Sequence, residues 1–114
     1  MGKKDLTRLI VKSDAAIENA GVRISALSVF ADIDDGDCTI SVHGEIEGLS
    51  GTSLSKDVEI SAAVYDAEGR MIALENTDID AETFFESEPF AITMFNVPLV
   101  TVGKVKVAAK KSKY

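Results

Sequence analysis

Apolar and polar residues alternate with a period of two along most of the chain, a pattern typical of half-buried β-strands. The clearest example is CTISVHGEI (38–46), in which Ile40, Val42 and Ile46 alternate with polar residues. Turn-forming residues such as DAEG (66–69) separate the alternating segments. Further segments with this period are VEISAAVYD (58–66), RMIALENTDI (70–79), FAITMFNV (90–97) and VGKVKVAAK (102–110).

The segment VRISALSVFADI (22–33) also alternates. Because successive strand residues point to opposite faces, its apolar residues divide into two sets. The predicted sets are Ile24, Ala26 and Phe30 on one face, and Leu27, Val29 and Ile33 largely on the other.

One segment, SDAAIENAG (13–21), predicts a helix of at most about two turns. Ser13 or Asp14 suits the N-cap, and Gly21 suits the left-handed position that follows a helix. The preceding LTRLIVK (6–12) is rich in β-branched residues. It is compatible with a first strand or with the lead-in to this helix.

Together these elements predict an all-β fold: an immunoglobulin-like antiparallel β-sandwich of about seven strands with one short N-terminal helix. The chain has 114 residues, of which 46% are hydrophobic, so one domain with a real core is expected. We expect an N-terminal segment with the helix at 1–21, the sandwich at 22–109 and a basic tail at 110–114.

Three stretches carry a resemblance to a known family: VHGEIEG (42–48), KDVEISAAVYDAEGRMIA (56–73), and FNVP (95–98) followed by VGKVKVAAK (102–110). They resemble the FxLYD-type domains of bacteria and archaea over about residues 23–109. Tyr65 and Asp66 match the end of that family's signature, whereas Ala62 and Val64 replace its Phe and Leu, and Gly48 stands where Asn is usual.

This resemblance implies a small immunoglobulin-like sandwich that serves as an accessory or interaction module, with no shared catalytic residues. The matching residues also have structural roles of their own. Tyr65 can bury its ring at a strand end, Asp66 can accept backbone N–H groups, and Gly69 can supply a positive φ in the turn.

The formal net charge is −7, and the charges are unevenly placed. Between residues 13 and 103, three basic residues stand against eighteen acidic ones, while lysines gather near both ends. A mostly acidic surface repels phosphate backbones, so nucleic-acid binding is not expected. The basic ends are interpreted as solubilising tails, or else as a basic patch that meets an acidic partner.

The acidic segment ADIDDGDCTI (31–40) raises the question of a metal site. Calcium takes oxygen ligands, and its candidate ligands here are Asp32, Asp34, Asp35 and Asp37. The EF-hand spacing fails, because a glycine stands at the fifth loop position and an aspartate at the sixth. We therefore expect an acidic hairpin turn first, and keep calcium binding as a minority hypothesis.

No catalytic constellation emerges from the sequence, and no cofactor is expected. The only histidine, His43, is on the polar side of a strand. A hydrolase that used Ser41 or Ser50 as its nucleophile would need a deep pocket that holds His43 beside a carboxylate. Cys38 is the only cysteine, which excludes a disulfide within the chain. It is expected to be buried and structural, because acidic neighbours disfavour its thiolate.

Adjacent Phe84 and Phe85 are a candidate interaction surface. Because neighbouring residues in an extended segment point to opposite sides, one ring is expected to be exposed. The short N-terminal helix could cover that ring; otherwise it is available to a partner.

These observations predict a non-enzymatic β-sandwich module of the accessory or interaction type. It would act by contact with an unknown protein partner or by self-association, for instance as a homodimer through an edge strand. The alternative is a ligand-binding module that uses the acidic loops in a calcium-dependent way; a hydrolase is less favoured. A sugar-binding version is weak, since the chain has no Trp and only two Tyr.

Neither a signal peptide nor a transmembrane run is visible in the sequence. We expect a soluble, cytoplasmic protein without membrane insertion, unless the chain is an excised domain of an exported one.

Overall fold

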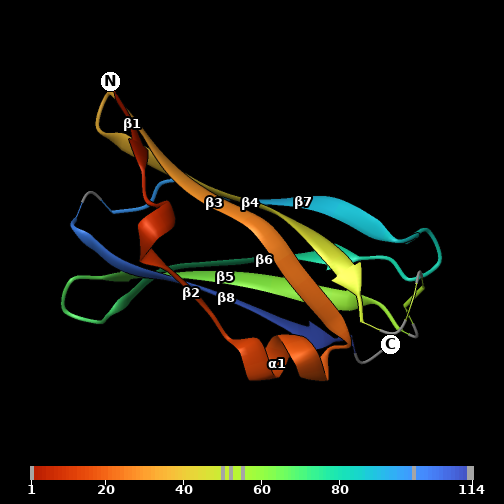
Figure 1. Cartoon of the computed structure of the whole chain (residues 1–114). Coiled ribbons are helices and arrows are strands. Elements are labelled where there is room, and N and C mark those ends of the chain that lie inside the picture. Colours follow the sequence, from red (N-terminus) through yellow and green to blue (C-terminus); the bar gives the residue numbers. More distant parts are fainter. Residues whose placement is uncertain (1, 50, 52, 55, 99, 113–114) are drawn as a thin grey trace.

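The computed structural model describes every residue except 1, 50, 52, 55, 99, 113 and 114. In the described part of the chain, eight strands, one 3-10 turn and one short helix form two stacked sheets (Figure 1). The elements are β1 (Gly2–Asp5), η1 (Thr7–Leu9), β2 (Ile10–Lys12), α1 (Asp14–Asn19), β3 (Val22–Asp34), β4 (Asp37–Gly48), β5 (Val58–Asp66), β6 (Met71–Ile79), β7 (Ser87–Met94) and β8 (Val102–Lys111).

The strands divide into two four-stranded sheets. Sheet A has the order β1-β3-β4-β7 and sheet B the order β2-β8-β5-β6. All pairs are antiparallel except β2 with β8, which is parallel. The predicted all-β sandwich with one short helix is therefore confirmed, with eight strands in place of about seven.

The core between the sheets is built from β-branched side chains. The buried residues that the structure describes include no polar or charged side chain. Alternation in β4, β5, β7 and β8 follows the sequence pattern, so their inward residues are buried and their outward ones mostly are not. The largest fully buried side chains are Ile40, Ile46, Ile60, Ile92, Val22, Val29, Val42, Val58, Val64, Val105 and Val107.

The predicted division of faces in β3 is wrong because of a β-bulge. The register with β4 shifts between Ser25 and Ser28, and Ala26 inside this step has φ +54. An extra residue reverses the alternation that follows it. Ile24 is thus buried before the bulge and Val29 after it, while Ala26 is exposed and Phe30 lies on the outer face.

The N-terminal segment crosses from one sheet to the other. Gly2–Asp5 pairs with β3 at the edge of sheet A, and Ile10–Lys12 pairs with β8 at the edge of sheet B. Between the two strands, the N–H of Leu6 donates to the carbonyl of Val29 at 2.8 Å, and the Leu6 side chain is buried. At the far end, Lys110 and Lys111 belong to β8.

The helix α1 follows the crossing and packs against β8 and β3 (Figure 1). Its apolar face buries Ile17, with Ala20 at the C-cap. Gly21 follows with φ +78, in the left-handed conformation that the sequence predicts. Ser13 occupies the N-cap, but its side chain makes no capping hydrogen bond.

The acidic segment forms the hairpin turn between β3 and β4. Asp34 and Asp37 form the last pair of the ladder, which leaves Asp35 and Gly36 as a two-residue loop. Both loop residues have positive φ, +49 and +83, as a type I′ turn requires. The prediction of an acidic hairpin turn is confirmed.

Gly44 in β4 is required for packing rather than for backbone freedom. An added Cβ would lie 2.8 Å from the Phe90 ring and 2.9 Å from Leu27. We expect Gly44→Ala to lower the free energy of unfolding by about 1–3 kcal/mol, because the buried Phe90 ring must shift. Urea unfolding measures this loss.

The matched control for that substitution is Gly2→Ala in β1, where an added Cβ meets nothing within 4 Å. We expect the control to change the free energy of unfolding by less than about 0.5 kcal/mol. Equal effects of the two substitutions would contradict the packing role of Gly44.

Candidate functional site

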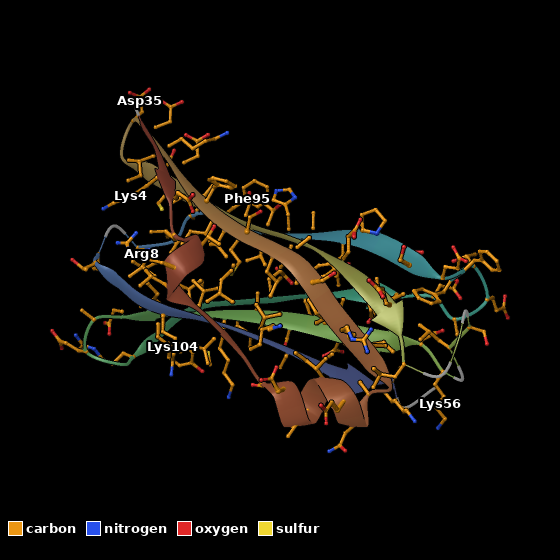
Figure 2. The ribbon with its side chains drawn as sticks, in the orientation of Figure 1. Lys4, Arg8, Asp35, Lys56, Phe95 and Lys104 are labelled. Carbon is orange, nitrogen blue, oxygen red and sulfur yellow. The ribbon has the colours of Figure 1, made fainter. Side chains whose placement is uncertain are left out.

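The four aspartates proposed for calcium lie around the β3–β4 turn. Asp32 faces outward from β3, Asp35 is in the loop, and all four side chains are exposed. In Figure 2 Asp35 lies at the tip of the hairpin, away from the body of the sandwich. The described residues contain no group of three or more His, Cys, Asp or Glu side chains that could hold a metal ion.

His43 lies exposed on the outer face of sheet A, between Ser28 of β3 and Ala91 of β7. Within the described residues its side chain makes no hydrogen bond and no ion pair. Ser41 lies two residues away on the same face, and Ser50 is outside the described residues. This open setting does not provide the deep pocket that a hydrolase would need.

Cys38 is buried at the start of β4. Burial raises the pKa of its thiol, and the nearby charge of Asp32 raises it further. A raised pKa favours the thiol over the nucleophilic thiolate. Cys38 therefore contributes packing at this position rather than reactivity.

The adjacent phenylalanines divide between the core and the surface. Phe84 is only 5% exposed and belongs to the core, so it contributes nothing to an outer surface. Phe85 is 69% exposed in the connection between β6 and β7. Since α1 packs against β8 and β3, it leaves this ring exposed.

A larger apolar surface lies on the outer face of sheet B. Leu74 is 60% exposed, Met71 51% and Val11 46%. The ladder places Val11, Lys106, Ala63 and Leu74 in one row across the four strands. The adjacent row contains Lys104, Tyr65 and Met71. We call this surface the lysine-framed face; its residues are Val11, Ala63, Tyr65, Met71, Leu74, Lys104 and Lys106.

A second bulge explains why two apolar residues of β6 share this face. Val64 pairs with Ala73 and Tyr65 pairs with Met71, so Ile72 is the extra residue. Without it, Met71 would point toward the core, since Leu74 points outward. The sequence pattern alone did not reveal the face, because neither this bulge nor the pairing of Val11 is visible in it.

The lysines of β8 lie between the apolar residues of the two edge strands, β2 and β6. Lys104 places its Nζ 4.5 Å from the centre of the Tyr65 ring, a cation–π contact. Lys110 is 3.6 Å from Glu59, whereas Lys106 makes no ion pair with an acidic side chain in the described residues. In Figure 2 Lys104 points away from the opposite sheet. The outer face of sheet B thus carries basic residues along the inner strand β8, with exposed apolar residues on the two edge strands, Val11 on β2 and Met71 and Leu74 on β6.

The outer face of sheet A differs from this face in its chemistry. It carries Phe95, 72% exposed, and Phe30 with the Lys3 ammonium 6.0 Å from its ring centre. In Figure 2 Phe95 lies on the side of the molecule opposite to Lys104. The remaining outward residues of β4 are hydroxyls, His43 and acidic side chains.

Tyr65 and Asp66, the residues shared with the FxLYD pattern, have structural roles in the β5–β6 turn. The Asp66 carboxylate accepts the backbone N–H groups of Glu68 and Arg70, both at 2.9 Å, and the Arg70 Nε at 3.3 Å. These donors, first of all the Arg70 N–H, lower the pKa of Asp66. Gly69 has φ +85, as the turn requires.

No family model, no curated protein and no solved structure gives a significant match to this chain. Among the described residues, no helix has the length and apolar character needed to span a membrane.

The lowered pKa of Asp66 predicts a pH-dependent contribution to stability. Since the pKa is lower in the folded than in the unfolded protein, the stabilisation is complete above the unfolded pKa of about 3.9. It is lost as the pH falls through the folded pKa. We expect Asp66→Asn to unfold at lower urea concentration than wild type at neutral pH, with the two curves converging in acid.

The matched control is Asp78→Asn, which removes an exposed carboxylate that accepts no hydrogen bond in the described residues. Its urea unfolding curve should not differ from that of wild type at neutral pH and then converge with it in acid. A constant difference between Asp66→Asn and wild type at every pH would show that the charge of Asp66 contributes nothing.

The calcium hypothesis predicts a shift in melting temperature, because a ligand that binds only the native state stabilises it. Because the aspartates are exposed and the described residues contain no ligand group for a metal, we expect no shift in millimolar calcium. Thermal unfolding monitored by circular dichroism measures this. A rise that disappears in Asp34→Asn would contradict this expectation and restore the calcium hypothesis.

Proposed function

We propose that this protein is a non-enzymatic interaction module that acts by protein–protein contact through the lysine-framed face. The observation that carries the proposal is the group of exposed apolar side chains, Leu74, Met71 and Val11, on an otherwise polar sheet face. Interaction sites combine exposed apolar area with polar groups. Here Lys104 and Lys106 of β8 lie between Val11 on one edge strand and Met71 and Leu74 on the other.

The strand order of the two sheets supports the proposal that the protein is an immunoglobulin-like module. In immunoglobulin-type sandwiches, strands A, B and E share one sheet, while C and F share the other with C′ beside C. The orders β3-β4-β7 and β6-β5-β8 correspond to A-B-E and C′-C-F. In this assignment β2 lies beside β8 where strand G would stand, but it comes first in the chain and runs parallel to β8. A bacterial FxLYD-type accessory domain remains the family that we propose on the resemblance of the sequence.

The chemistry of the face indicates its partner. Two copies of the same face would bring their lysines together, which costs free energy. An acidic surface with some apolar residues fits instead, and this chain itself carries eighteen acidic residues between positions 13 and 103. The partner we propose is therefore the acidic surface of a second copy, in a head-to-tail contact.

Sedimentation velocity over a range of protein concentrations tests self-association. We expect the sedimentation coefficient to rise with concentration, and to rise less at high salt, because salt screens the attraction. Leu74→Ser removes the most exposed apolar residue of the face. It should weaken self-association about tenfold, as loss of a central contact residue does.

The matched control is Leu49→Ser, which alters an exposed leucine outside the lysine-framed face. It should leave the concentration dependence unchanged. A strict monomer at every concentration and at both salt levels would overturn self-association, and equal effects of the two substitutions would exclude this face.

A further inference from the structure

A cavity of about 400 Å³ opens at the end of the sandwich near the β3–β4 turn. Its floor is apolar: Leu6, Ala31 and Cys38 are buried there. Ile33 and Val102 form part of its walls and are half-buried. This volume is within the range of small-molecule pockets, roughly 300–1,000 Å³.

Two cationic side chains line the same cavity, Lys4 from β1 and Arg8 from η1. The pairing of Lys4 with Ala31 places it on the cavity side of β1, whereas Lys3, paired with Asp32, is on the opposite side. In Figure 2 Lys4 and Arg8 lie on the same side of the molecule, along the N-terminal segment.

Neither cation is neutralised by an ion pair in the described residues. Arg8 donates only to the backbone carbonyl of Asp5, at 3.3 Å. The Asp5 carboxylate accepts the N–H of Thr7 at 2.9 Å, and the charge of Arg8 contributes to its lowered pKa, but the two side chains form no ion pair in the described residues. The guanidinium therefore keeps donors for an anion, as does the Lys4 ammonium.

We propose that this cavity binds a single-chain amphiphile with an anionic head, of which a fatty-acid carboxylate is the type. The alkyl chain would lie on the floor formed by Leu6, Ala31 and Cys38. The head would lie at Lys4 and Arg8, because a guanidinium and an ammonium both donate to carboxylate oxygens. This inference is independent of the lysine-framed face, which lies on the outside of sheet B.

Calorimetric titration of the full chain with hexanoate, octanoate and decanoate, each below its micelle concentration, tests the proposal. Each additional buried methylene should raise the affinity about three- to fourfold until the cavity is filled. Octyl sulfate should bind comparably to octanoate. Octanol, which has the chain without the charge, should bind more weakly.

Charge removal at the mouth separates this site from non-specific adsorption. Lys4→Gln combined with Arg8→Gln should weaken octanoate binding about five- to tenfold and leave octanol binding unchanged. Lys3→Gln is the matched control, since it removes a charge from the same strand on the opposite side. It should have no effect on octanoate.

Filling the floor provides a second readout, because Ala31 lies there. Ala31→Leu should abolish binding of both octanoate and octanol. If Ala31→Leu fails to fold, the calorimetric titrations of wild type and the charge variants decide. No binding heat, no chain-length dependence, or equal effects of the Lys3 and Lys4/Arg8 substitutions would overturn the proposal.

Discussion

The N-terminal crossing is the constraint on which the rest of the molecule depends. Gly2–Asp5 hydrogen-bonds to β3 in sheet A, and Ile10–Lys12 to β8 in sheet B. Between them Leu6 is buried in the core and Thr7 accepts the N–H of Val29 through its Oγ1 at 3.1 Å. One short segment thus joins both sheets along one side, and it supplies Val11 to the lysine-framed face and two cations to the cavity.

The described core is apolar throughout. The described core is made of aliphatic and aromatic side chains with one thiol, and no polar side chain is buried in it. Burying an unpaired polar group costs free energy, so a core of this kind gives stability but no reactive groups. The two candidate sites lie where apolar residues meet charge, at exposed Leu74 beside the lysines of β8 and at the cavity beside Lys4 and Arg8.

Much of the fold follows from the alternation of apolar and polar residues. The lysine-framed face and the cavity do not follow from it. The inward residues of β4, β5, β7 and β8 were predictable, because each strand is long and regular. Strand β1 was not predictable, because GKKD (2–5) has no apolar residue and forms a strand only by pairing with β3. The bulge at Ala26, which reverses the faces of β3, was not predictable either. It depends on the pairing of β3 with β4 and not on the sequence of β3 alone. The cavity joins Leu6, Ala31 and Val102, which are far apart in the sequence.

Native-state hydrogen exchange tests the crossing most directly. The N–H of Leu6 donates to Val29 and that of Ser13 to the carbonyl of Val107, at 2.8 and 2.9 Å. If the crossing holds both sheets, these amides exchange only through openings that also expose amides of β3 and β8. The account predicts protection of Leu6 and Ser13 within about tenfold of that of the central strand β5. Exchange of both amides at the rate of an unstructured tail, with β3, β5 and β8 still protected, would contradict it.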